Sequence, residues 1–434
     1  MFAIADICSS SEDGSSNGTD EEIELLFVPW KLVIGGRFGR MDYTTTPGSP
    51  TTTVVEREEL MCDVIHTLAK EIQRGERSDW YPYIDYLGRL PHLVANWTNV
   101  ALVELQGLAP QYDASRHLHW FDARCSQSNL RRYQGNQDNN IDEDAINSSL
   151  IAFISRASEV GMIPIYDLIN HHNGKRNVKL RPTNNGVHLV VFSSSTLDGN
   201  INTTTNNVII KQGQELYLSY GIKIASTMYR DYGFVESWPT CWNFMDVISG
   251  DNYAFVSFDT TSSIPPPPSV NGDGGEGGII VISAINPTED YLRNMWNTGG
   301  IISQEEYEFL AIKHTETLSI LELQRFVDAA HVRYNDFPST INEDNSLLVD
   351  IRHRQQQQKR DETAMPMPNG GGDDDGRSTS DIAESRTNDE DDIVSAIQYR
   401  IAFKSALVGS AIFAESIIAN KVNRELDDNK NVEL

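Results

Sequence analysis

Two short segments, about fifty residues apart, carry the side chains whose types and spacing could do chemistry. Residues 163–171 read Ile-Pro-Ile-Tyr-Asp-Leu-Ile-Asn-His, and residues 213–221 read Gly-Gln-Glu-Leu-Tyr-Leu-Ser-Tyr-Gly. The hydroxyl of Tyr220 can orient a reacting group, and the amide of Asn170 can hydrogen-bond a cofactor. Taken alone, each residue has a simpler structural interpretation: Tyr220 as a core tyrosine at a strand end, and Asn170 as a turn residue.

Histidine and aspartate side chains around the first segment raise the alternative of a metal site. They are His117, His119, Asp122, Asp167, His171 and His172. Their spacing does not match that of a ligand pair on a helix. The four cysteines are Cys8, Cys62, Cys125 and Cys241, and no two of them have the spacing of a zinc cluster. We therefore expect no metal site, no disulfide framework and a reducing compartment.

In this order, the two segments resemble the paired motifs of SET-domain protein methyltransferases, in particular the Rubisco large-subunit lysine methyltransferase-like subfamily. A later Tyr-Gly-Phe at 232–234 and several earlier segments strengthen the resemblance. The earlier segments are Arg74 to Ile84, Leu90-Pro91, Trp97 and Leu105 to Gly107. The resemblance covers residues 1 to about 240, whereas the C-terminal part resembles the family's substrate-binding lobe only by its place in the chain and its helical sequence pattern.

The resemblance implies a role for each matched residue. Tyr220 matches the catalytic tyrosine, which also contributes to the cofactor site. The other implied cofactor-binding residues are Asp167, Asn170, His171 and Tyr232. Arg156 and Tyr232 are implied as walls of the substrate channel. Without the resemblance, Arg156 is equally well explained as a structural ion-pair partner.

The implied reaction is methyl transfer from S-adenosylmethionine to a lysine side-chain amine of a protein. This in-line displacement needs a neutral amine aligned with the methyl carbon in a pocket that excludes water. Because the pKa of a free lysine is about 10.4, a desolvated channel must help it lose a proton. Tyr220 would hold the neutral amine. The subfamily also includes an actin-histidine methyltransferase, so histidine, which is largely neutral at pH 7, is the alternative acceptor.

The family's first motif is matched only at its end, by Met1 to Ile7. In the family, a Gly-x-Gly turn precedes these residues and lets the backbone approach the cofactor. We expect that the sequence is truncated before Met1. The alternative is a catalytically inactive SET-like module that binds another protein.

Length and charge narrow the classes of partner. A chain of 434 residues suffices for two or three domains, and a net charge of −27 disfavours nucleic acid as a ligand. The charge suits a protein substrate that is basic at its target site. No apolar run appears long enough to span a bilayer. We expect a monomer without membrane contact, in the cytoplasm or nucleus, or in a plastid if a targeting segment precedes Met1.

The expected fold class is α+β: a β-rich SET-domain fold with a helical insertion and an all-α C-terminal lobe. Residues 1–245 form the SET domain, which the insertion at 55–150 interrupts. A loop-rich connection covers 246–284. The helical, substrate-binding-like domain covers 285–434 and contains a disordered insert at 353–392, where glutamine, glycine and aspartate runs replace apolar residues.

Local patterns predict individual elements within this frame. Leu60, Val64, Leu68 and Ile72 recur every four residues and predict a helix from about residue 56. Alternating or β-branched runs predict strands at 23–27, 187–192 and 208–211. Ser303 and Glu306 fit a capping box that opens a helix towards Ala330, and a last amphipathic helix is expected from about 393 to 420.

Overall fold

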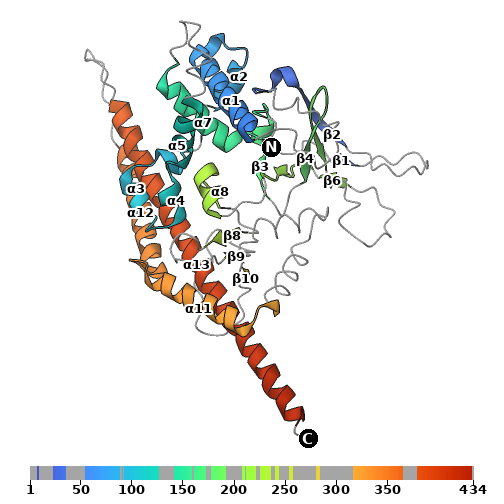
Figure 1. The fold of residues 1–434 in the computed structure, drawn as a ribbon. Coiled ribbons are helices and arrows are strands. Elements are labelled where there is room, and N and C mark those ends of the chain that lie inside the picture. Colours follow the sequence, from blue (N-terminus) through green and yellow to red (C-terminus); the bar gives the residue numbers. More distant parts are fainter. Residues whose placement is uncertain are drawn as a thin grey trace, which may run out of the picture. The chain divides into compact units, whose positions relative to one another are not determined.

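The computed structural model describes part of the chain: residues 7–8, 23–35, 54–87, 90, 92–126, 141–158, 161–172, 177–191, 208–210, 212–220, 225–235, 240–243, 254–257, 280–283, 316–364 and 379–432. These residues form helices and small sheets, so the fold is mixed α+β (Figure 1). The chain forms two compact units. The described part of the first lies within Met1–Leu93 and Ser115–Ile222, and that of the second within Val94–Ala114, Lys223–Tyr291 and Glu306–Leu434.

The largest sheet of the first unit is antiparallel. Its strand order is β2 (Glu24–Pro29), β5 (Gly186–Val191) and β4 (Val178–Pro182). The strands predicted at 23–27 and 187–192 are confirmed. β5 is buried along most of its length because it is the central strand and its valine and leucine side chains face the core.

Two shorter strand pairs bring distant segments together in the first unit. β1 (Ile7–Cys8) pairs antiparallel with β6 (Val208–Ile210), which confirms the strand predicted from residue 208. The preceding residues of the partial first motif lie outside the described residues. β3 (Asn170–His171) pairs in parallel with β7 (Tyr217–Leu218). This pairing places the two chemically suggestive segments side by side.

Several helices of the first unit lie within the residues that the structure describes. They are η1 (Trp30–Leu32), α1 (Val54–Arg74), η3 (Gly75–Arg77), α2 (Tyr81–Leu87), α5 (Arg116–Phe121), η5 (Asp122–Ser126), α7 (Glu143–Arg156) and η6 (Tyr166–Leu168). The helix predicted from the four-residue stripe is confirmed as α1, whose Val64 and Leu68 are buried. They pack in one core with Leu150 and Phe153 of α7, because both helices turn an apolar face inwards.

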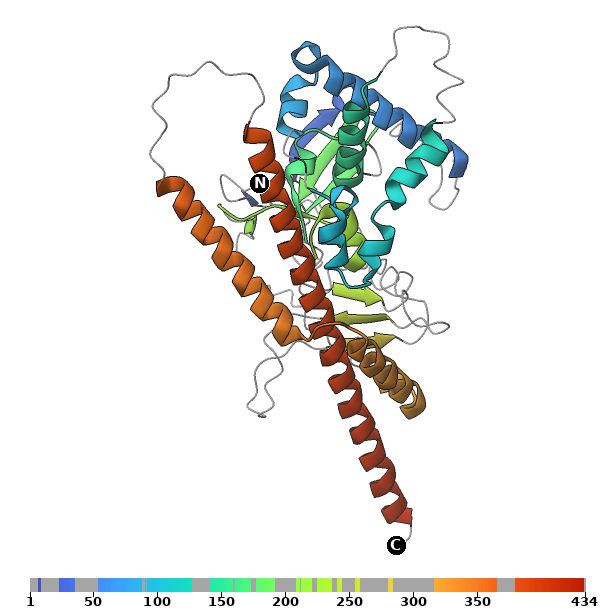
Figure 2. The same cartoon turned by 90° about the vertical axis from the view of Figure 1, so that its left-hand side faces the viewer.

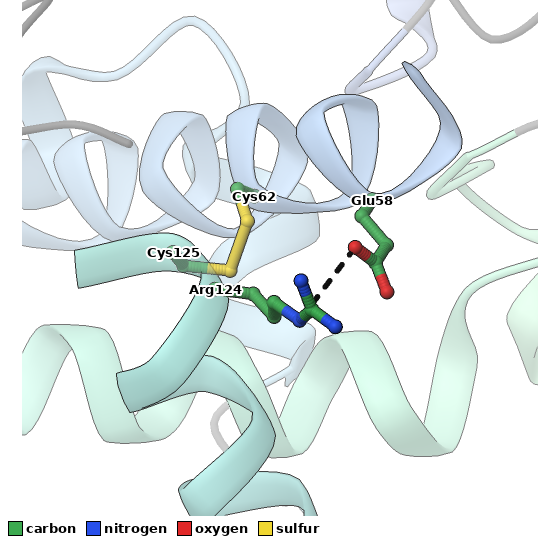
Figure 3. The surroundings of a disulfide bond; sticks show 4 residues. All are labelled: Glu58, Cys62, Arg124 and Cys125. Carbon is green, nitrogen blue, oxygen red and sulfur yellow. Dashed lines mark ion pairs between the residues drawn. A yellow bond between two sulfur atoms is a disulfide. The ribbon is translucent and has the colours of Figure 1, made fainter. Parts of the chain in front are cut away.

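A disulfide joins Cys62 of α1 to Cys125 of η5 (Figure 3). This corrects the expectation of no disulfide framework. The two cysteines are 63 residues apart, so no local spacing signals the bond; the packing of α1 and η5 brings their Cα atoms within 5.2 Å. Beside the bond, Arg124 Nε lies 3.8 Å from Glu58 Oε2, a second link between the same two elements (Figure 3).

Removal of this cross-link is expected to destabilise the first unit. In the double variant Cys62→Ala/Cys125→Ala, the free energy of unfolding should fall by about 2–4 kcal/mol, because the unfolded chain regains the entropy of an open loop. Urea titration of the oxidised wild type and the variant measures the difference. The wild type treated with a thiol reductant is the control and should unfold like the variant. Identical unfolding of all three samples would contradict a stabilising role.

The second unit combines helices with a three-stranded antiparallel sheet. Its helices are η4 (Val94–Asn96), α3 (Asn99–Val103), α4 (Ala109–Asp113), α8 (Ala225–Tyr232), α11 (Ile320–Asn335), α12 (Ile341–Ala364) and α13 (Thr379–Val432). Its sheet has the order β10 (Ile280–Ser283), β9 (Ala254–Ser257) and β8 (Thr240–Asn243). In Figure 2, α11 and α12, in orange, flank the long red helix α13. Phe326 of α11 and Leu407 of α13 are fully buried in their shared core.

The second unit adds detail to one expectation and corrects another. Within the connection predicted to be loop-rich at 246–284, the described residues form β9 and β10, because the Ala-Phe-Val-Ser and Ile-Val-Ile-Ser runs have strong β propensity; the rest of the connection lies outside the described residues. The segment predicted to be disordered at 353–392 is helical at both ends, up to Ala364 and from Thr379 onwards. Glutamine, arginine and lysine are good helix formers even where they cannot build a core.

Helix boundaries near the C-terminus were predicted only in part. α11 opens with a capping box between Ser319 and Glu322, whereas the one predicted at Ser303 and Glu306 lies outside the described residues. The last predicted helix, from about 393 to 420, lies within the longer α13.

By length and composition, Asp389–Asp427 of α13 could cross a membrane, which corrects the expectation that no segment could. Half of its apolar window is buried within the protein. Arg400 and Lys404, in the middle of this stretch, are fully buried, and each lies 2.7 Å from an oxygen of Asp344 in α12. A buried and paired charge is what a core helix of a folded unit requires.

Candidate active site

The parallel pair β3–β7 determines which side chains of the two segments meet. Asn170 is paired with Tyr217 and His171 with Leu218. The next residue, His172, donates its backbone N–H to Leu218 O at 2.9 Å, so the register continues beyond the strand. Because successive side chains of a strand point to opposite sides, exposed Asn170 and buried His171 face different surroundings.

Tyr220 is held at both its backbone and its hydroxyl. Its backbone N–H donates to His171 Nδ1 at 2.9 Å, and the two rings lie 5.0 Å apart. Its hydroxyl donates to Ile169 O at 2.7 Å. Since the hydroxyl proton is committed to Ile169, the lone pairs of the phenol oxygen remain able to accept a hydrogen bond from another group.

The electrostatic surroundings of Tyr220 keep its hydroxyl neutral. Burial is the main cause that raises the pKa of Tyr220 to about 12; the charge of Arg156 opposes the rise, and the charges of Asp167 and Tyr86 add to it. Tyr220 is therefore protonated at pH 7, and it can orient a partner without acting as a strong base.

Asp167 lies in η6 and is buried. Tyr83 of α2 donates its hydroxyl to Asp167 Oδ2 at 2.8 Å, and Arg156 of α7 donates Nη1–H to the backbone oxygen of Asp167 at 2.7 Å. Burial raises the pKa of Asp167 to about 6, although the hydrogen bond from Tyr83 and the charge of Arg156 oppose the rise. Burial and the Asp167 charge in turn raise the pKa of Tyr83 well above its ordinary value.

Two buried polar atoms of this group lack a hydrogen-bond partner among the residues that the structure describes. They are Asp167 Oδ1 and Arg156 Nε, an acceptor and a donor. Buried polar groups are almost always paired, and unpaired ones concentrate where a site serves chemistry. The backbone just before η6 is strained as well: Ile165 has φ 75°, which is rare for a β-branched residue.

Asn170 is the exposed member of the group and makes a polar contact that the sequence did not predict. Its Nδ2 donates to Glu215 Oε1 at 2.6 Å. The other oxygen of Glu215, Oε2, accepts the hydroxyl of Tyr217, also at 2.6 Å. The hydrogen bond from Tyr217, followed by the one from Asn170, holds the pKa of Glu215 below its ordinary value. Glu215 is therefore a carboxylate at neutral pH.

The structure thus brings together five of the six predicted site residues in the first unit. They are Arg156, Asp167, Asn170, His171 and Tyr220. Tyr232 ends α8 of the second unit, where its ring lies 6.2 Å from that of Phe234. Its role at the site stays a prediction. Among the residues that the structure describes, no group of three or more His, Cys, Asp or Glu side chains could hold a metal ion.

Two polar residues of the site, Tyr83 and Glu215, were not predicted as site residues. Both lie within segments on which the resemblance rests, but the sequence did not indicate their hydrogen-bond partners. Tyr83 lies 84 residues before its partner Asp167, and Glu215 lies 45 residues after Asn170. A pairing over such distances needs the tertiary fold to be known.

Replacement of Tyr83 by phenylalanine should destabilise the first unit through Asp167. At pH 8, the buried carboxylate would lose its hydroxyl donor, and we expect the free energy of unfolding to fall by about 1–3 kcal/mol. The loss should be smaller at pH 5, where the carboxyl is largely protonated. Urea titration at the two pH values measures this, with Tyr81→Phe on the same helix as control. An equal loss at both pH values would contradict the assigned partner.

Comparisons with known proteins give a structural likeness only. No family model and no curated protein matches the chain. Among solved structures, Rubisco LSMT bound to sinefungin and monomethyllysine is similar with a TM-score of 0.46 and 17% identity, over 98% of this chain and 86% of that one. The SET domain of LSMT bound to lysine and AdoHcy is similar with a TM-score of 0.44 and 16% identity, over 98% of this chain and 85% of that one. Rubisco LSMT bound to AdoMet is similar with a TM-score of 0.43 and 17% identity, over 98% of this chain and 85% of that one.

Proposed function

We propose that this chain is an S-adenosylmethionine-dependent protein methyltransferase of the SET type, with a lysine side-chain amine as its acceptor. The observation that carries the proposal is the hydroxyl of Tyr220. It is neutral, it donates to Ile169 O, and it lies beside His171 at the junction of the two motif segments. In this proposal residues 1–245, with their insertion at 55–150, form the catalytic domain, and residues 285–434 recognise the substrate.

The donors and acceptors of the site fit such a cofactor. S-adenosylmethionine carries a sulfonium and an ammonium, which require acceptor groups, and a carboxylate, which requires a cation. Asp167 and Asn170 supply acceptor oxygens. Arg156 supplies the cation, and its buried Nε has no hydrogen-bond partner among the residues that the structure describes. We expect Asp167, Asn170, His171, Tyr220 and Tyr232 to hold the cofactor, which supplies a methyl group activated by its positively charged sulfur.

Tyr220 then positions the acceptor nitrogen. Its oxygen accepts one N–H of the incoming amine, because its own proton is committed to Ile169 O. That contact directs the nitrogen lone pair, and alignment of the reacting atoms supplies much of the rate. A lysine must arrive without its ammonium proton, and a desolvated channel disfavours the charged form. The high pKa of Tyr220 assigns this hydroxyl to orientation rather than proton removal.

The charge of the chain bears on its partner. A net charge of −27 attracts a protein that is basic around its target residue and repels nucleic acid. The proposal therefore includes a basic protein substrate and no nucleic-acid partner, and we retain a monomeric enzyme as an expectation. Its proposed compartment is the cytoplasm, the nucleus or a plastid, and the bond between Cys62 and Cys125 is unusual for the reducing conditions of the first two.

Incubation with methyl-labelled S-adenosylmethionine and arrays of basic peptides tests the function, with mass spectrometry to locate the label. Paired peptides should differ only in lysine or histidine at the target position. We expect label on lysine Nζ. Label on histidine instead would change the acceptor and keep the class. Binding of S-adenosylmethionine without transfer to any peptide would favour an inactive binding module.

A further inference from the structure

We propose that Glu215 is a positioning residue that determines which side of the Asn170 amide meets a ligand. The inference rests on the proposed function, because it takes the ligand at Asn170 to be S-adenosylmethionine. Glu215 itself touches no reacting atom in this account. It acts through Asn170, the exposed residue of the candidate cofactor site.

The contact between the two side chains has only one chemically allowed polarity. Asn170 Nδ2 lies 2.6 Å from Glu215 Oε1. A carboxylate accepts hydrogen bonds and donates none, so the amide nitrogen must face Glu215. The amide oxygen of Asn170 is then directed away from Glu215. The ligand group that meets this oxygen must be a donor, such as an amino or ammonium group.

Glu215 is anchored strongly enough to impose this orientation. Tyr217 donates its hydroxyl to Glu215 Oε2 at 2.6 Å. Asn177 fixes the backbone on both sides of the intervening residue: its Nδ2 donates to Glu215 O at 2.9 Å, and its Oδ1 accepts the N–H of Tyr217 at 2.9 Å. The side chain and the backbone of Glu215 are both held against β7, which is itself paired with the strand of Asn170.

The arrangement adds little to the stability of the fold. Asn170 is exposed and Glu215 is partly exposed, and polar contacts of this kind contribute little to stability in water. Three hydrogen bonds nevertheless converge on the glutamate. Their combined effect is to orient one exposed amide, which is the requirement of a binding site whose ligand presents a fixed donor.

A polarity-swap series tests the inference. Glu215→Gln replaces an obligate acceptor by an amide that can turn either atom towards Asn170. Asn170→Asp places two carboxylates in contact, which repel each other. Each single change should weaken the binding of S-adenosylmethionine by about tenfold, the loss expected for one well-oriented hydrogen bond. In the double variant Asn170→Asp/Glu215→Gln, the new glutamine donates to the new aspartate, and an oxygen again faces the ligand.

Calorimetric titration of the full chain gives the dissociation constants, with Glu76→Gln, an exposed glutamate of the same unit, as control. Recovery of the double variant to within about threefold of the wild type would support the inference, because the losses of two independent changes would add, whereas recovery shows that the two positions are coupled. Binding by Glu215→Gln equal to the wild type would overturn it. So would a double variant no better than Asn170→Asp alone.

A measurement without ligand separates this inference from the proposed function. Selective ¹⁵N labelling of asparagine should show slowed exchange of the Asn170 amide protons in the wild type and faster exchange in Glu215→Gln. Unchanged exchange in the variant would overturn the pairing. If the wild type bound no S-adenosylmethionine, the proposed function and the ligand assignment would both fail, even where the exchange result upheld the pair.

Discussion

Replacement of Tyr220 by phenylalanine is expected to lower the rate of methyl transfer by about 100-fold or more, while the affinity for S-adenosylmethionine stays within about twofold. The substitution removes one oxygen atom. The hydroxyl of Tyr220 donates its proton to Ile169 O, and in the proposed reaction its oxygen accepts an N–H from the acceptor amine. Contacts of the ring with His171 are retained in the variant, so the cofactor side of the site should keep its shape.

Two measurements distinguish the loss of amine orientation by Tyr220 from a general disturbance of the fold. Single-turnover rates report the chemical step, and calorimetry reports cofactor binding in the same protein. Tyr334→Phe on α11 of the second unit loses the same atom at a position that the proposal does not use. It should behave as the wild type in both assays. Equal turnover by Tyr220→Phe and the wild type would remove the hydroxyl from the mechanism.

Replacement of Asp167 by asparagine should stabilise the first unit at neutral pH. The pKa of Asp167 rises from an ordinary 3.8 to about 6 in the folded protein. Between roughly pH 4 and pH 6, the folded protein therefore holds a proton that the unfolded chain has released. The stabilisation by the protonated carboxyl is complete below about pH 4, declines across this window, and is lost once the pH has risen through 6. Above pH 6, the buried carboxylate costs about 3 kcal/mol relative to an exposed one.

The asparagine variant has no such titration. Its advantage in unfolding free energy over the wild type should therefore grow by about 3 kcal/mol from pH 4 to pH 7 and then stay level. Urea titrations of both proteins at matched pH values give this difference, in which the other carboxylates cancel. A difference in unfolding free energy that stays constant across this pH range would contradict a raised pKa of the buried Asp167 carboxyl. A residue that costs the fold stability is expected where chemistry requires it.

Elements with a strong local pattern could be predicted from the sequence. The apolar stripe of α1 and the β-branched run of β5 each repeat over several residues, so their type was clear before the fold was known. β3 and β7 are two residues long and have no periodicity, and their pairing arises only from tertiary packing. The helical ends of the segment predicted to be disordered were missed because composition reports the lack of a core, whereas helix propensity reports local order.

The candidate site shows the same division between local and distant information. Asn170 and Tyr220 were predicted as members of two sequence motifs, and the structure places their segments together. Tyr83, which donates to Asp167, and Glu215, which accepts from Asn170, make contacts across the fold that no spacing rule indicates. The bond between Cys62 and Cys125 was missed for the same reason.

Calorimetric titration of S-adenosylmethionine into the purified chain, at two temperatures to avoid an accidental zero in enthalpy, tests whether this protein binds the cofactor. We expect saturable one-to-one binding at micromolar affinity, weakened by Glu215→Gln and little changed by Tyr220→Phe. The absence of detectable heat at both temperatures, together with an unfolding temperature that the compound does not raise, would contradict it.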